Sequence, residues 1–143
     1  MKAYGIMGGT FDPIHNGHLR MAEAALEQLG LDEVLFIPDG DPPHKEELAS
    51  ASDRLEMVEL AIKGRDGFRT LDMEVMRAGQ TYTVDTLERL KADSPSDQFT
   101  YIVGADTLVR IESWRNFPRV ASLLAGIAFA PRADVSAAEA ELQ

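Results

Sequence analysis

The run from Gly8 to His18 follows a short apolar stretch, Tyr4 to Met7, and leads into a long amphipathic one. Apolar residues recur in that second stretch at helical spacing as far as Gly30, a residue suited to a helix C-terminus. Where a strand passes into a helix through glycines, backbone N–H groups and the positive end of the helix dipole converge. The run therefore predicts a strand, a loop and a helix that together bind the phosphates of a nucleotide.

The remaining sequence alternates short apolar runs with amphipathic segments. Gly64 is expected to end the second helix, Thr83 to cap the third, and residues 39–50 to form a loop. Residues 133–143 read as a terminal helix or a frayed tail. The expected strands are 2–7, 34–37, 68–73, 99–103 and 126–130. The expected helices are 19–29, 55–62, 83–92, a short one after Asp106, and 119–124.

This alternation predicts the α/β class, with a doubly wound parallel sheet covered on both faces. We expect the strand order 3-2-1-4-5 in a single domain over residues 1–143. The first and fourth strands are then neighbours, and ligands bind beyond their carboxyl ends, where the winding reverses. The loop from Gly8 to His18 and the segment from Gly104 to Asp106 would meet there.

Composition excludes several classes of protein. With 45% hydrophobic and 27% charged residues, the 143-residue chain reads as one globular domain. It contains no cysteine, so disulfides and thiolate metal sites are ruled out. A net charge of −10 argues against general nucleic-acid binding. No stretch resembles a signal peptide or the roughly 20 apolar residues of a membrane span, so we expect a cytoplasmic protein.

His15 and His18 stand three residues apart at the expected helix start, on roughly the same side. Gly17 between them would let a ligand approach the backbone closely. A helix N-terminus disfavours imidazolium, whereas a bound polyphosphate favours it. Taken singly, a glycine pair is more often a plain turn and one histidine more often a cap. The whole eleven-residue string in this context favours a phosphate site.

The string also resembles the signature of the nucleotidyltransferase superfamily, whose HxGH motif is similar to the HIGH motif of class I aminoacyl-tRNA synthetases. Its Gly8 to His15 portion matches the wording of the bacterial nicotinate mononucleotide adenylyltransferases. Three more segments resemble that family: Pro38 to Lys45, Thr81 to Leu87, and Gly104 to Asp106 together with Trp114. The resemblance covers nearly all of residues 1–132 and implies a Rossmann-like nucleotidyltransferase fold.

The resemblance also implies roles for individual residues. His15, His18 and Lys45 would be catalytic, with Lys45 as the mobile cation of its loop. Mg²⁺ would arrive with ATP, without a metal site built by the protein. The implied ATP-binding residues are Gly8, Gly9, Thr10, Phe11, His15, Gly17, His18, Gly104 and Asp106, with Thr10 and Phe11 supplying backbone or side-chain donors. The implied substrate-binding residues are Lys45, Arg54, Thr83, Thr86, Trp114 and Arg132.

Simpler readings of some of these residues stay open. Lys45 could be a solvated lysine on a proline-rich turn, and Arg54 an ordinary surface arginine in the first turn of a helix. Trp114, the only tryptophan, could be a hydrophobic anchor, or its ring could stack on a pyridine ring.

The implied reaction is attack by the phosphate of nicotinate mononucleotide on the α-phosphate of ATP, giving deamido-NAD and pyrophosphate. Members of the family continue to an I-S-S-T-x-I-R motif that grips the triphosphate, and this sequence reaches Gln143 without it. We therefore expect either a fragment or a C-terminally shortened relative. The alternatives to an active enzyme are an impaired nucleotide-binding module, which could form a homo-oligomer, and a pantetheine-phosphate adenylyltransferase.

Overall fold

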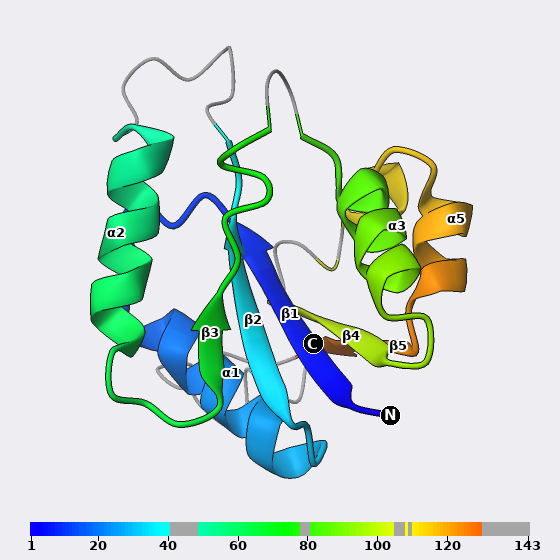
Figure 1. Cartoon of the computed structure of the whole chain (residues 1–143), viewed down its shortest axis with the longest axis horizontal. Helices are drawn as coiled ribbons and strands as arrows, with labels where there is room; N and C mark the ends of the chain where they lie inside the picture. The colour runs from blue at the N-terminus through cyan, green and yellow to red at the C-terminus, as the bar shows by residue number, and fades with distance from the viewer. Residues whose placement is uncertain (41–48, 78–80, 105–107, 109, 130–143) are drawn as a thin grey trace.

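Five parallel strands form one sheet in the order β3-β2-β1-β4-β5 (Figure 1). The computed structural model describes residues 1–40, 49–77, 81–104, 108 and 110–129. The predicted class and strand order are confirmed. The strands are β1 (Ala3–Gly9), β2 (Glu33–Pro38), β3 (Phe68–Thr70), β4 (Gln98–Val103) and β5 (Gly126–Phe129).

Helices cover both faces of this sheet. Residues of α1 and α2 pack into one hydrophobic core, and residues of α3, α5 and the short 3₁₀ helix η1 pack into a second. In Figure 1 α1 passes behind β2 and β3, and α3 and α5 lie together at one side. The helices are α1 (Asn16–Gln28), α2 (Ala51–Ile62), α3 (Thr83–Asp93), η1 (Ile111–Ser113) and α5 (Phe117–Leu123).

The inner strand β2, which lies between β3 and β1, contributes to both cores because its side chains alternate between the two faces. Val34 and Phe36 belong to the core under α1 and α2, whereas Leu35 and Ile37 belong to the core under α3 and α5. All four are buried, as expected of a strand covered on both faces. This explains why the strand reads as a continuous apolar run.

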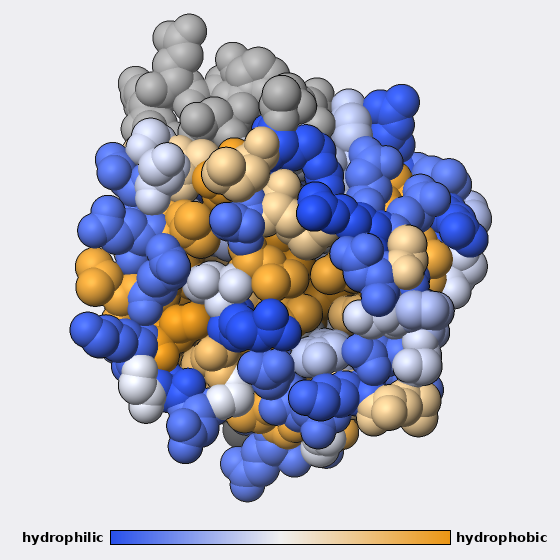
Figure 2. Space-filling view, viewed as in Figure 1, coloured by the Kyte–Doolittle hydropathy of each residue, from blue (hydrophilic) through white to orange (hydrophobic). Residues whose placement is uncertain are grey.

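The second core is less completely covered than the first. Tyr4, Leu71, Met73 and Leu90 pack against it while only partly buried. Figure 2, which looks at the molecule from the same side as Figure 1, shows apolar side chains gathered near the centre of this face and hydrophilic ones around them.

The predicted helix ends are confirmed where glycine adopts a left-handed backbone. Gly30 has φ +62°, its N–H donates to Glu27 O at 3.4 Å, and the N–H of Leu31 donates to Leu26 O at 3.1 Å. These two bonds form the Schellman closure of α1. Gly64 follows α2 with φ +78°.

Two expectations about the middle of the chain are wrong. Thr83 is not the cap of α3: Tyr82 occupies the cap position, no side chain caps the helix, and Thr83 is the first helical residue. The third strand ends at Thr70 rather than at 73, because the chain turns at Asp72, whose carbonyl accepts from the N–H of Met76 at 2.9 Å.

Other boundaries moved or fall outside the described residues. Helix α5 begins at Phe117, two residues earlier than expected, since Pro118 fits the first turn of a helix, where its missing N–H is not needed. Most of the expected helix after Asp106, residue 130 of the last strand, the tail 133–143 and residues 41–48 of the loop lie outside the described residues.

The sheet brings the ends of β1 and β4 to the same edge. The register pairs Ala3 with Gln98 and Ile6 with Tyr101, so Gly8 and Gly9 at the end of β1 and Gly104 after β4 lie at the same edge of the sheet. This is the expected position for a ligand. In the part of the chain that the structure describes, no helix has the length and apolar character needed to cross a bilayer.

We expect Leu87→Ala to lower the free energy of unfolding by about 2 to 5 kcal/mol, because Leu87 is fully buried between α3 and the sheet. The matched control is Leu60→Ala, since Leu60 on α2 is 65% exposed and should cost less than about 0.5 kcal/mol. Urea denaturation measures both. Equal losses in the two variants would contradict the described packing of α3.

Candidate active site

His15 and His18 together cap the N-terminus of α1. The cap residue is His15, whose Nδ1 accepts from the N–H of Gly17 at 3.1 Å. The backbone N–H of His15 in turn donates to Nδ1 of His18 at 3.1 Å, which completes a reciprocal capping box. Imidazoles here replace the serine and glutamate common at such positions. Since each Nδ1 accepts, each neutral ring carries its proton on Nε2.

The two imidazole rings are stacked, with centroids 3.8 Å apart and planes at 29°. Phe11 supports them from inside the protein, because its ring lies edge-on to His18 at 5.1 Å and against Phe36 at 6.1 Å. Phe11 is buried and has φ +51°, uncommon for a residue with a side chain. The Phe11 ring is part of the core, so of the backbone or side-chain donors expected from Thr10 and Phe11, Phe11 has only its backbone N–H to offer.

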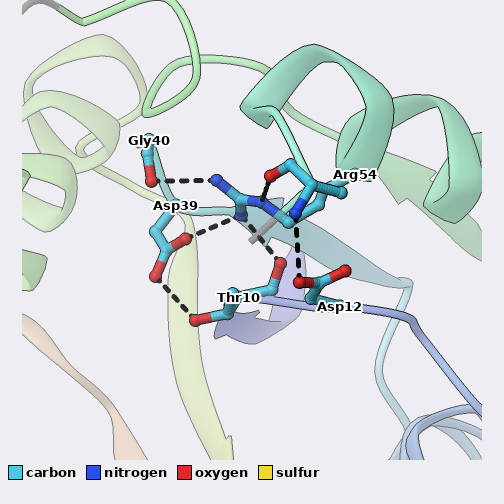
Figure 3. Close-up of polar contacts among 6 residues, drawn as sticks. Thr10, Asp12, Asp39, Gly40 and Arg54 are labelled. Atoms are coloured by element: carbon cyan, nitrogen blue, oxygen red, sulfur yellow. Dashed lines mark hydrogen bonds and ion pairs between the residues drawn. The ribbon is translucent and has the colours of Figure 1, made fainter. Parts of the chain in front are cut away.

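Arg54 is a fully buried arginine with several oxygen partners (Figure 3). Its Nη1 donates to Asp39 Oδ1 and to Thr10 O, both at 2.8 Å. Its Nε donates to Ala49 O and its Nη2 to Gly40 O, each at 3.0 Å. The Thr10 hydroxyl donates to the other oxygen of Asp39 at 3.2 Å. We call these five residues the Arg54 cluster.

The Arg54 cluster ties three segments together: the loop after β1, the end of β2 and the start of α2. A further bond reinforces it, from the N–H of Ala49 to Asp12 Oδ2 at 3.2 Å (Figure 3). Arg54 is therefore not the ordinary surface arginine that its position in the first helical turn suggested. The guanidinium meets protein oxygens and has no exposed surface, so in this structure it positions the loops around the histidine pair.

Glu74 is a half-buried carboxyl that sequence reasoning missed. Thr86, only 2% exposed, donates its hydroxyl to Glu74 Oε2 at 2.7 Å and accepts from Arg77 Nη1 at 3.4 Å. Burial raises the pKa of Glu74, and the nearby charge of Asp39 adds to this, while hydrogen bonds with Thr86 and Thr81 oppose it. Thr86, which the sequence predicts to bind substrate, thus has its hydroxyl bonded to this interior group.

Trp114 packs edge-on against Tyr101, with ring centroids 5.1 Å apart and planes at 71°. Trp114 itself is half-buried, so part of its indole stays accessible. Burial raises the pKa of the Tyr101 hydroxyl far above its usual range, so this group stays neutral; a hydrogen bond with Thr83 partly opposes the shift. Tyr101 thus contacts both Thr83 and Trp114, two residues that the sequence predicts to bind the substrate. No sequence motif includes Tyr101 itself.

The structure brings most of the described candidates to one edge of the sheet. Gly104 follows β4 and lies beside Met21 of α1.

Three expected site residues, Lys45, Asp106 and Arg132, lie outside the described residues. Over residues 1–40, 49–77, 81–104, 108 and 110–129, no three acidic or histidine side chains gather as metal ligands would. The candidates placed at the junction after β1 are Gly8, Gly9, Thr10, Phe11, His15, Gly17 and His18.

Replacing Arg54 with leucine should lower the free energy of unfolding by about 3 to 5 kcal/mol, because Asp39 and three carbonyl oxygens lose a buried partner. Arg65→Leu is the control, since it removes an exposed arginine that pairs with Glu23 and should cost about 0 to 1 kcal/mol. Urea denaturation compares the two. A loss for Arg54→Leu no larger than for the control would refute the structural role of the cluster.

Glu74→Gln should stabilise the protein more at pH 8 than at pH 4. Because the pKa of Glu74 is raised in the folded state, its contribution to stability is present below its ordinary pKa of 4.5. That contribution is lost as the pH rises through the pKa of the folded state, where the buried carboxyl becomes charged. Glutamine stays neutral and keeps an acceptor for Thr86. The melting temperature of the variant should therefore exceed that of the wild type mainly at pH 8, when both are measured at the two pH values. Glu56→Gln, at an exposed position of α2, is the control that should show no such difference.

Comparison with known proteins places this geometry in a family. The family model described as cytidylyltransferase-like matches residues 6–134. A Geobacter sp. (strain M21) protein named "Probable nicotinate-nucleotide adenylyltransferase" is 50% identical over 122 residues, which are 83% of this chain and 56% of that protein. A Shouchella clausii protein of the same name is 43% identical over 131 residues, 90% of this chain and 68% of its own length.

The fold has solved counterparts. Nicotinic acid mononucleotide adenylyltransferase from Plasmodium falciparum, solved in complex with NaAD, superposes with a TM-score of 0.79 at 19% identity, over 95% of this chain and 78% of that one. This likeness concerns the fold. The chain spans little more than half the length of several relatives that it matches in sequence. By the family model and by the Shouchella relative, the chain belongs to the cytidylyltransferase-like family, among the nicotinate-nucleotide adenylyltransferases.

Proposed function

We propose that this chain carries the reaction centre for adenylyl transfer from ATP to nicotinate mononucleotide, giving deamido-NAD and pyrophosphate. The observation that carries the proposal is the stacked pair His15 and His18, which caps α1 at the edge where β1 and β4 end. Both rings have Nε2–H as their donor, and the helix start adds backbone N–H groups and a positive dipole end. The names of the sequence relatives support the choice of substrates.

In the proposed reaction an oxygen of the mononucleotide phosphate attacks the α-phosphorus of ATP. The bond to the bridging oxygen of the β-phosphate breaks, and pyrophosphate leaves with that electron pair. The attacking phosphate is already an anion at neutral pH, so the protein needs no general base. Its tasks are alignment of the two phosphates and stabilisation of the developing charge. His15, His18 and the start of α1 are the described groups suited to both tasks.

The acceptor would bind on the side of Trp114. The accessible part of the indole suits stacking against the pyridine ring, and Thr83 lies at the first turn of α3, beside Tyr101. The family resemblance supports Gly104 and Asp106 at the ribose of ATP and Lys45, Arg54, Thr86 and Arg132 on the substrate side. For Arg54 and Thr86, which are buried, we propose that this contribution is made by positioning neighbouring groups.

We further propose that Mg²⁺ arrives bound to the triphosphate. This fits the donor set of the described residues, which lacks a cluster of three protein ligands. When bound, the ion would neutralise phosphate charge. The histidine pair would add directed hydrogen bonds.

His15→Asn tests the proposal with little disturbance of the helix, because asparagine also caps helix N-termini but cannot reproduce the Nε2–H donor. We expect pyrophosphate release from ATP, Mg²⁺ and nicotinate mononucleotide to fall by about 10²- to 10³-fold, as is usual when one transition-state donor is lost. Arg20→Ala, an exposed cation on the same helix, is the control and should leave the rate unchanged. Circular dichroism checks that both variants fold.

Equal rates of pyrophosphate release by the wild type and by His15→Asn would contradict the proposed role of the histidine pair. Calorimetry that detects mononucleotide binding without any pyrophosphate release would instead identify a nucleotide-binding module. Turnover with phosphopantetheine but not with nicotinate mononucleotide would identify a pantetheine-phosphate adenylyltransferase.

A further inference from the structure

Tyr101 lies between the two halves of the candidate site. It belongs to β4, pairs in register with Ile6 of β1 and is only 8% exposed. Its side chain contacts the end of β1, the start of α3 and the residue after η1, which are remote from one another in sequence. None of the sequence motifs includes it.

The first contact is with Gly8. A Cβ placed on Gly8 would lie 2.1 Å from the Tyr101 hydroxyl oxygen and 3.3 Å from Cζ, far closer than non-bonded atoms approach. Gly9 has a positive φ, which itself favours glycine, whereas Gly8 has none. Gly8 is therefore required for space, and the tip of the Tyr101 ring occupies that space.

The second and third contacts reach the expected acceptor half. The Tyr101 ring meets the indole of Trp114 edge-on at 5.1 Å, and the hydroxyl groups of Tyr101 and Thr83 share a hydrogen bond. Both partners are residues to which the proposed function gives the nicotinate end. Since a strand in the middle of a sheet is rigid, contacts made from β4 hold their partners at a set distance from Gly8.

We propose that Tyr101 is a positioning residue, which holds Trp114 and Thr83 at a fixed distance from Gly8 at the end of β1. The nicotinate ring, bound at Trp114 and Thr83, would then place its phosphate at the histidine pair. This inference rests on the proposed function. It assigns to Tyr101 no contact with the reacting atoms. Its effect should therefore appear in the binding of the acceptor and leave ATP binding unchanged.

Tyr101→Phe removes the bond to Thr83 and keeps the ring against Trp114. We expect the Kd for nicotinate mononucleotide to rise about 2- to 10-fold, the usual effect of losing one neutral hydrogen bond, while the KM for ATP stays constant. Trp114 is the only tryptophan of the chain, so its fluorescence reports both mononucleotide binding and its own packing. Tyr101→Leu, which removes the ring, should also shift the emission maximum of the unliganded protein.

Tyr4→Phe is the control, because it removes the hydroxyl of a partly buried tyrosine in the same sheet, whose ring is stacked against Phe99. It should change neither constant. An unchanged Kd in Tyr101→Phe, or an equal rise in the KM for ATP, would overturn the inference. A wild-type chain that fails to bind the mononucleotide at all would overturn the proposed function and this inference with it.

A double-mutant cycle with Gly8→Ala tests the contact without any ligand. Gly8→Ala should lower the melting temperature strongly in the Tyr101 background and less in the Tyr101→Phe background, because the hydroxyl oxygen is the nearest clashing atom. The relief should be partial, since Cζ stays within 3.3 Å of the added carbon. Additive losses in the cycle would contradict the proposed contact between Tyr101 and Gly8.

Discussion

The candidate site depends on the buried guanidinium of Arg54. A charged group without access to water is costly unless every donor meets an acceptor, and here a carboxylate and three carbonyl oxygens provide the acceptors. One planar group thereby sets the relative positions of Thr10, Asp39 and the start of α2. Lysine, with a compact ammonium in place of a rigid fork, could not reach the same four oxygens. The start of the loop that leads to the histidines is thus held against the end of β2 and the start of α2.

Local patterns predicted the architecture because strand and helix periodicity and glycine at helix ends are local properties. They failed where a side chain's partner is remote in sequence. Arg54 looked like a surface residue because Thr10 and Asp39 reach it only in the folded chain. Thr83 has the propensity of a helix cap, but it lies inside the helix and its hydroxyl bonds to Tyr101. The histidine pair was predictable because its two members are three residues apart.

The two halves of the site use different chemistry and still touch. The phosphate half consists of backbone groups and imidazoles at the start of α1, and the acceptor half consists of hydroxyls and aromatic rings packed on β4. The segments that support the two halves also meet at Gly40 of the Arg54 cluster, where an added Cβ would lie 3.0 Å from the carbonyl oxygen of Glu74. A side chain at Gly40 would therefore disturb the Arg54 cluster and the segment carrying Glu74 together. Residues far apart in sequence are thus held against one another at this boundary.

The histidine cap links the protonation of the rings to the integrity of α1. An imidazolium has a proton on both nitrogens, so a charged His15 could no longer accept from Gly17, and a charged His18 could no longer accept from His15. Both hydrogen bonds of the helix start thus require a ring nitrogen, Nδ1, that carries no proton. In the proposed function the histidines would therefore contribute directed Nε2–H donors to a phosphate while their Nδ1 atoms hold the first turn of α1. The same two rings would then serve the helix with one nitrogen and the ligand with the other.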